Sequence, residues 1–556
     1  MKTGIALLLI LAATVMVVSS TAKVISLKSL KRLSAPVKKS CYSHDGIGVN
    51  RLHPLWGSAG ESFPRLTPAA YTDNVKVPPR QKYSARELSN TFCKQEACDT
   101  SNKFGVNAMF YAFGQFIDHD IDQTGLGPRN SETFPIPVPN GDRFVNPISF
   151  TRSIYSSEKA IYAISHVNQV NMITAYMDAS QIYGSDPIKA NALRTLRGGL
   201  LKVNSLYGDE FLPSSFTHNG KFFSGGNNNS VIAGDDRLTE SLPITVMQTL
   251  FLREHNRLAR LVAKRFKFCK SQQKKKHIDE YIYQTARAIN TAQIQSIAYK
   301  EYLPRLLGKY SPNPRKLRFN PNVQVTPSNE FATAAYRFGH SLVSCELRRV
   351  DESYQQLSVI EFKDAFNAFA RLLKDKKEID YVIRGLTSHN SQNLDEKIAD
   401  GLRDFLFGPN VRLDLASNNI QRGRDHGLGS FNEIRKYLGL KELTSKEITS
   451  DSSLQTKLET YFGENLENLD PWLGILIERK KGNSQLGELG TTILRKGFSN
   501  LVEGDPCFFT NTKAKWIRDL KSAVEKVTLA DIIAANTGIK RTDKTLGQSA
   551  FEAKTL

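Results

Sequence analysis

Long stretches of helical periodicity constrain the fold of this chain more than any other feature. Pro243 can begin a helix because its missing backbone N–H would have no partner in the first turn. Apolar residues then recur on one helical face, at Ile244, Met247, Phe251, Leu258 and Leu261. The same period covers residues 278–303, and a third stripe holds Phe331, Ala335, Phe338, Leu342 and Cys345. No strand-like alternation of any length is present. The sequence therefore predicts one large, mainly α domain with little β structure.

The N-terminus has the pattern of a secretory signal peptide. Lys2 precedes an apolar run from Gly4 to Val18 and small residues up to Ala22, a run too short to span a membrane. We expect residues 1–22 to be this signal and residues 23–80 an irregular arm. Residues 81–540 would form the folded domain, and residues 541–556 a C-terminal tail. We expect the chain to be frayed after Thr537. No other segment approaches the length of a membrane span.

Charge and cysteine content narrow the class of protein further. The formal charge is +20, but the lysines are dispersed, which favours a solvated basic surface over a specific nucleic-acid site. Such a surface can contact anionic surfaces or matrix. Six cysteines are few for a secreted chain of this length, so burial must supply most of the stability. Cys93 and Cys98 are close enough to close a small loop, and no further thiolates or histidines follow at the spacing of a metal site, so we expect a disulfide between them. The pairing of the rest is undetermined.

Residues 113–124 concentrate chemically useful side chains in a segment that otherwise reads as a helix. Gln115, Asp118 and His119 stand at i, i+3 and i+4 and so share one face. Asp120 lies about 100° further round. One turn can therefore offer a base, a carboxylate and an amide to one cavity and a second carboxylate to another site. Taken alone, a solvated acidic turn is the more common explanation.

Two loops contain candidate sites, one for a metal ion and one for a glycan. Thr174, Asp178 and Ser180 offer oxygens at even spacing, which suits Ca²⁺ although such loops are common. A Gly/Asn-rich loop over residues 200–236 contains Asn228, the acceptor of an N-x-S sequon and a candidate for glycosylation.

Three later segments add candidate site residues. Arg237 and Glu240 lie just before the helix that Pro243 begins, and Glu254 with His255 on that helix is best explained as a packed structural pair. Arg337 and His340 lie on the third apolar-striped helix, where a lone histidine is usually a satisfied core residue. Residues 415–427 are rich in side chains that form hydrogen bonds.

Together these segments resemble the animal haem peroxidases, the group of myeloperoxidase, lactoperoxidase and peroxinectin in the peroxidase–cyclooxygenase superfamily. The resemblance runs from about Cys41 to Gly538. It rests on five segments in the family's order: GQFIDHD (114–120), TAYMDASQIYG (174–184), AGDDRLTE (233–240), YRFGH (336–340) and NIQRGRDHG (419–427).

The resemblance implies roles on both sides of a haem. His119 would be the distal base and Arg237 the distal cation, with Gln115 holding a water or a halide. His340 would be the proximal ligand of the haem iron, and Asn419 would accept the hydrogen bond from its Nδ1–H.

Other matching residues would hold the cofactors. Asp118 and Glu240 would form ester links to haem b, and Arg337 and Arg422 would lie near the haem pocket. The implied Ca²⁺ ligands are Asp120, Thr174, Asp178, Ser180 and the backbone carbonyl of Tyr176.

Elementary chemistry agrees with these roles. Heterolysis of hydrogen peroxide needs a proton moved from one oxygen to the other, which an imidazole can accept and return. A fixed guanidinium stabilises the negative charge that develops on the departing oxygen. An imidazole that donates its second N–H to an amide becomes more basic and supports ferryl iron.

The expected function is a secreted haem peroxidase that reduces hydrogen peroxide through a ferryl intermediate and oxidises a small donor. Position 241 is Ser, where myeloperoxidase has the methionine of its sulfonium link to haem. Strong chloride oxidation is therefore not expected, and bromide, iodide, thiocyanate or phenols are the favoured donors. Host defence, the response to oxidative stress and matrix cross-linking would all suit such an enzyme.

Two alternatives come from the same superfamily. Fatty-acid dioxygenases place a tyrosine three residues before the proximal histidine, but here that position is Arg337 and Tyr336 is one residue away. A peroxinectin-like adhesion protein would be an added role, and the chain contains no Arg-Gly-Asp or Lys-Gly-Asp sequence.

Overall fold

The structure is a computed structural model, and it describes residues 23–79, 81–98, 102–127, 132–156, 166–223, 231–269, 271–272, 275–407 and 411–554. The signal peptide predicted for residues 1–22 and the sequon at Asn228 lie outside these ranges. Within them, no helix combines the length and the apolar character that crossing a bilayer requires.

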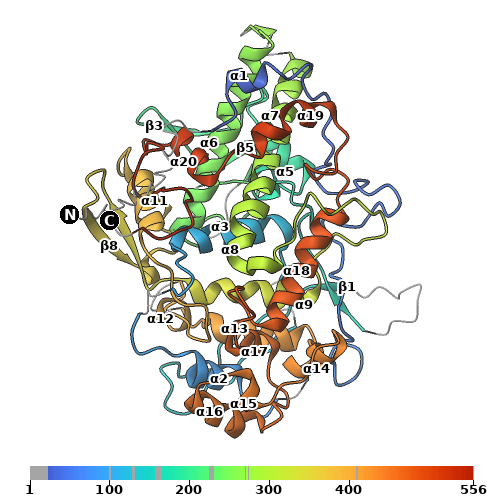
Figure 1. Cartoon of the computed structure of the whole chain (residues 1–556), viewed down its shortest axis with the longest axis vertical. Helices are drawn as coiled ribbons and strands as arrows, with labels where there is room; N and C mark the ends of the chain where they lie inside the picture. Colours follow the sequence, from blue (N-terminus) through green and yellow to red (C-terminus); the bar gives the residue numbers. More distant parts are fainter. Residues whose placement is uncertain are drawn as a thin grey trace, which may run out of the picture.

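Helices dominate the regular structure of the described residues, which confirms the predicted fold class (Figure 1). The longer α-helices are α3 (Ala108–Ile121), α6 (Leu242–Arg265), α7 (Lys276–Ile297), α11 (Glu378–Ser388), α13 (Leu415–Asp425), α16 (Ser452–Phe462), α18 (Glu488–Glu503), α19 (Lys515–Val524) and α20 (Leu529–Asn536). The shorter α-helices are α1 (Leu27–Leu30), α2 (Ala85–Leu88), α4 (Ser180–Tyr183), α5 (Pro187–Ala192), α8 (Leu303–Leu307), α9 (Asn329–Thr333), α10 (Phe369–Leu372), α12 (Asp400–Arg403), α14 (Phe431–Tyr437), α15 (Ser445–Ile448) and α17 (Pro471–Ile477). Single π or 3₁₀ segments are η1 (Ser89–Cys93), η3 (Ala298–Tyr302), η4 (Gly308–Tyr310), η5 (Ala335–Leu342) and η6 (Phe362–Asp364).

Strands form only two-stranded antiparallel sheets in the described part of the chain. The pairs are β1 (Tyr155–Ser156) with β2 (Asn168–Gln169), β3 (Asn204–Leu206) with β4 (Asp209–Phe211), β5 (Phe216–His218) with β6 (Lys221–Phe223), and β7 (Glu346–Val350) with β8 (Gln356–Glu361). Two of these hairpins fall in residues 200–236, where the sequence predicts only a loop. They are too short to show a strand-like alternation.

The helices α3, α6 and α7 form the centre of the molecule, and α6 packs against both of the others (Figure 1). On α6, Pro243 occupies the first turn as predicted, and the apolar stripe from Ile244 to Leu258 is buried. Helix α3 is buried on almost all sides, and Gln115 and Asp118 are among the few partly exposed residues on it. A helix enclosed in this way holds its polar side chains in fixed positions.

The second predicted helix changes its hydrogen-bonding pattern near its end. Helix α7 ends at Ile297 and continues through the π turn η3 into α8. Glu301 on this turn is 8% exposed. Its Oε1 accepts a hydrogen bond from the backbone N–H of Leu529 at 3.0 Å, whereas Oε2 has no partner among the described residues. Burial raises the pKa of Glu301 to about 7.

Replacing Glu301 by Gln should change the pH dependence of stability. An unfolded glutamate releases its proton near 4.5, whereas the folded protein retains it up to about 7, so the stabilisation is complete below 4.5 and is lost as the pH rises through 7. Glu301→Gln should raise the free energy of unfolding by about 1–3 kcal/mol near pH 8 and change it little near pH 4. Urea titrations at the two pH values measure this difference, and an equal effect at both would contradict it.

The third predicted helix is wrong in type. Only α9 is α-helical, and residues 335–342 form the 3₁₀ segment η5, with Cys345 beyond its end. Ala334 at the junction has φ −124°, which interrupts the α-helical hydrogen bonds. The 3₁₀ period of three residues per turn still places Arg337 and His340 on one side of the segment.

The predicted pairing of Cys93 with Cys98 is also wrong. The disulfides are Cys41–Cys507 and Cys98–Cys345, whereas Cys93 is a buried free thiol and Cys269 an exposed one. Cys93 ends the π turn η1 and points into the core, so it is unavailable to its sequence neighbour.

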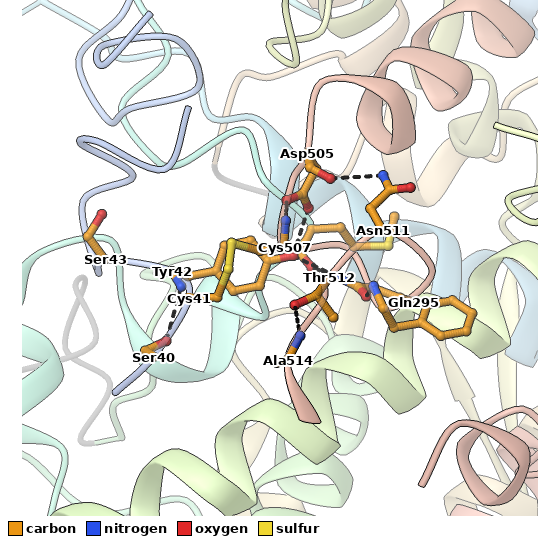
Figure 2. The surroundings of a disulfide bond; sticks show 12 residues. Ser40, Cys41, Tyr42, Ser43, Gln295, Asp505, Cys507, Asn511, Thr512 and Ala514 are labelled. Atoms are coloured by element: carbon orange, nitrogen blue, oxygen red, sulfur yellow. Dashed lines mark hydrogen bonds between the residues drawn. A yellow bond between two sulfur atoms is a disulfide. The ribbon is translucent and has the colours of Figure 1, made fainter. Parts of the chain in front are cut away.

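The Cys41–Cys507 disulfide joins the N-terminal arm to the C-terminal part of the domain (Figure 2). Beside it, the hydroxyl of Tyr42 donates to Asp505 at 2.7 Å and accepts from Gln295 at 3.0 Å. In its described residues 23–79 the arm has one short helix, α1, and these buried contacts anchor it.

The prediction of a frayed C-terminal tail is wrong. Leu546, Ala550 and Phe551 are fully buried. The ring of Phe551 lies 5.2 Å from that of Phe113 and 6.0 Å from that of Phe110, both on α3. The tail therefore covers the helix that carries His119. The sequence did not reveal this contact, because the tail is short and polar and a single large apolar residue, Phe551, packs its ring against α3.

Candidate active site

A cavity of about 1060 Å³ brings the predicted haem-site residues together. The predicted residues that line it are Gln115, Asp118, His119, Arg237, Glu240, Arg337, His340 and Arg422. They come from α3, from the turn before α6, from η5 and from α13. The cavity is large enough to hold a cofactor of the size that proteins commonly enclose.

Asp235 organises the basic end of the cavity. Its carboxylate accepts hydrogen bonds from Nε and Nη2 of Arg237, the shorter at 2.7 Å, and it lies 3.5 Å from Nδ1 of His119. Burial opposes ionisation of Asp235, yet Arg237 and His119 hold the pKa of its carboxyl below the usual value. The Asp235 carboxylate is 1% exposed; its hydrogen bonds fix the guanidinium of Arg237, and its negative charge lies beside the imidazole of His119.

His119 is held as a neutral base. Burial and the neighbouring Arg237 lower the pKa of His119 to about 3, and its Nδ1 makes no hydrogen bond with a described residue. Its Nε2 lies 3.7 Å from Glu240. A neutral imidazole beside a guanidinium is the form able to accept a proton from a substrate.

The two carboxyls expected to form esters lie close to this pair. Glu240 accepts a hydrogen bond from Nε2 of Gln115 at 3.0 Å, and Asp118 lies 3.9 Å from Arg237. Burial raises the pKa of Asp118 to about 6 and that of Glu240 to about 7, against the opposing effect of Arg237. Glu240 is deep in the molecule although its side chain is 38% exposed, because it lines the cavity.

His340 contacts Asn419 as predicted, with the polarity reversed. Nδ2 of Asn419 lies 2.8 Å from Nδ1 of His340, while its Oδ1 accepts a hydrogen bond from Arg337 at 3.3 Å. The guanidinium attracts the amide oxygen, so the amide nitrogen faces the imidazole. Half a turn of the amide would make Asn419 the expected acceptor. Burial and then Arg337 lower the pKa of His340 to about 3, so the ring is neutral.

Arg422 reaches the cavity from α13. Its Nη1 donates to Asp425 and to Ser153 Oγ, both at 2.9 Å. Burial lowers the pKa of Arg422 to about 10, and Arg337 adds to this effect. Arg337 and Arg422 thus bring two positive charges to a cavity that also exposes His340.

The expected calcium residues form a separate buried cluster. Asp120 and Asp178 are both fully buried, and burial together with Asp178 raises the pKa of Asp120 well above its usual value. Thr174 donates to Asp178 at 3.1 Å and Ser180 to Asp120 at 3.2 Å, while the carbonyl of Tyr176 accepts from the N–H of Asp178 at 2.8 Å. None of these residues lines the cavity. The described residues contain no group of three or more His, Cys, Asp or Glu suited to a metal.

Gly234 lies where the buried cluster of expected calcium residues meets the cavity. A Cβ at this position would lie 2.2 Å from the carbonyl oxygen of Ser180. Only glycine therefore lets the turn that carries Asp235 and Arg237 pack against the loop that carries Asp178 and Ser180.

The residues present fit a haem. With the Asn419 amide turned so that its oxygen accepts from Nδ1–H, neutral His340 leaves the lone pair of Nε2 for iron, and no described residue forms a hydrogen bond with that Nε2. A Cβ on the adjacent Gly339 would meet nothing within 4 Å, so open space adjoins the ring on the cavity side. Arg337 and Arg422 supply charges that suit carboxylate groups.

Asp235 is the main site residue that the sequence analysis did not identify. It stands two residues before Arg237 in a tight turn. Its carboxylate also accepts a hydrogen bond from the backbone N–H of Arg237 at 2.7 Å. The available signal was an acid placed beside a candidate cation. The structural role predicted for Glu254 and His255 on α6 is confirmed, because both side chains are fully buried, but they do not pair with each other. His255 bonds to Tyr183 and Gly199, both at 2.9 Å, and Glu254 accepts hydrogen bonds from Arg257, the shorter at 2.7 Å.

Comparisons with known proteins identify the family of this chain. The sequence model of the animal haem peroxidase family, "Animal haem peroxidase", matches residues 41–550. Lactoperoxidase of Mesocricetus auratus is 31% identical over 547 residues, which cover 88% of this chain and 75% of that protein. The structure of peroxidase A from Dictyostelium discoideum superposes with a TM-score of 0.80 at 28% identity, over 90% of this chain and 98% of that one.

The chain belongs to the animal haem peroxidase family, and it is a haem peroxidase. An Oryza sativa fatty acid α-dioxygenase structure has a TM-score of 0.77 at 18% identity, over 96% of this chain and 89% of that one, which shows the shared fold alone. In this chain the residue three before His340 is Arg337, whose Nε donates to the carbonyl of Ala332 at 3.0 Å.

Proposed function

We propose that the protein is a secreted peroxidase that uses hydrogen peroxide to oxidise bromide, iodide, thiocyanate or small phenolic donors. The observation that carries the proposal is the placement of His119, Arg237 and His340 around one cavity, with both imidazoles held neutral. A role in host defence, in the response to oxidative stress or in matrix cross-linking would follow from the donor.

Within this proposal, the chain's residues act on protons and charge. Bound haem would supply an iron that exchanges electrons with peroxide and with the donor. Nε2 of His340 would hold that iron, and Arg337 and Arg422 would bind the haem carboxylates. His119 would accept the proton of the peroxide oxygen that approaches the iron and return it to the departing oxygen. Arg237, fixed by Asp235, would stabilise the charge on that oxygen.

The buried acidic pair supports a structural calcium ion. Two adjacent carboxylates at zero exposure repel each other, and a dication bound by Asp120, Asp178, Thr174, Ser180 and the carbonyl of Tyr176 would remove that repulsion. Because Asp120 follows His119 directly, such an ion would also fix the position of the imidazole. Glycosylation at Asn228 belongs to the same proposal of secretion.

The proposed donors follow from position 241. Ser241 stands at the N-cap position of α6 and lines the cavity, at the sequence position where the family resemblance places the sulfonium-forming methionine. Without that electron-withdrawing link, chloride should be a poor donor and the more easily oxidised anions and phenols good ones.

A visible spectrum of the purified protein before and after hydrogen peroxide tests the function. A Soret band that shifts with peroxide and returns when iodide is added is the expected result. A band that shifts with peroxide but returns only with phenols would remove the halide part of the proposal. A protein without haem would overturn the whole proposal.

Covalent attachment of haem is a separate prediction. Extraction with acidified organic solvent should leave haem on the chain through Asp118 and Glu240. Asp118→Asn should remove one link, and the double substitution with Glu240→Gln should release all haem into the solvent, as peptide mapping by mass spectrometry can show. Complete release from the unsubstituted protein would contradict the ester links.

A further inference from the structure

Met172 carries the only sulfur atom among the described residues that line the haem cavity. Its side chain is 43% exposed, whereas Met109, Met177 and Met247 are fully buried. No step of the proposed peroxidase chemistry uses Met172. A thioether is polarisable and is readily converted to a sulfoxide. The wall of this cavity therefore presents a reactive sulfur to any oxidant that forms inside it.

Backbone hydrogen bonds hold Met172 in place on this wall. Its N–H donates to the carbonyl of Gln123 at 2.8 Å, and the N–H of Ile154 donates to the carbonyl of Gly125 at 2.9 Å. The segments around residues 124, 154 and 171 therefore lie side by side. A Cβ on Gly125 would lie 2.9 Å from both Cγ and Sδ of Met172, so the glycine leaves the space that the thioether fills.

Met172 lies on the side of the cavity that holds the proposed distal residues. Gln123, which accepts the N–H of Met172, directly follows Asp122. The carbonyl of Asp122 accepts a hydrogen bond from Nη2 of Arg237 at 3.0 Å. The guanidinium and the wall that carries the sulfur are thus joined through two adjacent peptide groups. Because His119, Arg237 and Met172 all line one cavity, an oxidant formed beside the first two need not leave it to reach the third.

We propose that hypobromous acid formed in this cavity oxidises Met172 to methionine sulfoxide before the acid escapes. The inference rests on the proposed function, because oxidation of bromide by hydrogen peroxide supplies the hypobromous acid. The oxygen of the acid forms a bond with Sδ while its bonds with bromine and hydrogen break, and bromide and a proton leave. Sulfur loses two electrons and bromine gains them. The sulfoxide adds a polar group to the part of the wall where Ile154 also packs over Gly125.

Confinement favours Met172 over thioethers in solution. One molecule of acid in a cavity of about 1060 Å³ corresponds to an effective concentration of about 1.6 M. A thioether dissolved outside the protein meets the acid only after it has left the cavity. A soluble thioether should therefore protect Met172 from acid added to the solution but not from acid made by the enzyme.

Peptide mass spectrometry of the holoenzyme after turnover with hydrogen peroxide and bromide tests the proposal. N-acetylmethionine at about 10 mM, roughly 100-fold below the effective concentration in the cavity, intercepts the acid that has escaped. A parallel sample with the same scavenger receives the same total amount of reagent hypobromous acid and no peroxide. We expect at least about tenfold more sulfoxide at Met172 in the turnover sample. Equal amounts in the two samples would overturn the proposal.

Val145 provides the matched control because it is 90% exposed and does not line the cavity. Val145→Met adds a thioether that bulk oxidant reaches more easily than it reaches Met172. During turnover with the scavenger present, Met172 should be oxidised and the introduced methionine should stay intact. Equal oxidation of the two side chains in this variant would overturn the proposal, because exposure alone would then explain the modification.

Two further readings of the same samples separate this inference from the proposed function. Peroxide without bromide should leave Met172 intact, and equal oxidation without bromide would overturn the proposal. The bromide-dependent sulfoxide of N-acetylmethionine reports whether the enzyme oxidises bromide at all. Oxidised scavenger with intact Met172 would overturn the inference and leave the proposed function standing. A scavenger that is not oxidised would remove bromide from the proposed function, and the inference with it.

Discussion

Replacing His119 by alanine should lower kcat/KM for hydrogen peroxide by about 10²- to 10⁴-fold, the usual contribution of a positioned general acid–base. The imidazole is 3% exposed, is neutral because burial and Arg237 lower its pKa to about 3, and lies in the same cavity as Arg237. Stopped-flow measurement of the peroxide reaction, expressed per haem from the Soret absorbance, gives the rate. An unchanged rate constant would refute the acid–base role.

The control for His119 is another histidine. His277 is exposed at the start of α7 and does not line the cavity. His277→Ala should therefore leave kcat/KM unchanged. Added imidazole should restore part of the rate to His119→Ala but not to a variant that has lost its haem. A variant with less haem but an unchanged rate per haem would assign the residue to haem binding instead.

Replacing Phe551 by alanine should lower the free energy of unfolding by about 3–5 kcal/mol, the usual cost of removing a fully buried aromatic ring. The ring contacts Phe110, Phe113 and Tyr302, with centroids 5.2–6.2 Å away. A frayed tail would give a change within about 0.5 kcal/mol. Urea unfolding, with the slope of the transition compared between the two proteins, measures the difference.

Phe104 provides the matched control for Phe551. It precedes α3 in the chain and is 40% exposed, so removing its ring removes much less buried contact than removing the ring of Phe551. Phe104→Ala should lower the free energy of unfolding by less than about 1.5 kcal/mol. Equal effects of the two substitutions would show that the tail packing is not what stabilises α3.

The sequence by itself determined the helical class and most of the site. The apolar period of α6 and α7 follows from side-chain spacing, and the proximity of Gln115, Asp118 and His119 follows from helical geometry. These are local properties, because residues three or four apart on a helix are always neighbours. For the same reason the packed position of His255 was predictable from its place on an apolar helix.

Only the tertiary structure decided how distant residues pair. Asp235 pairs with Arg237 and lies beside His119 because the turn before α6 packs against α3, which no local spacing encodes. Cys98 paired with Cys345 rather than with Cys93 because Cys93 points into the core. Phe551 covers α3 because the tail returns to the centre of the molecule. Such contacts depend on burial across hundreds of residues, and a chain's own local preferences carry little information about them.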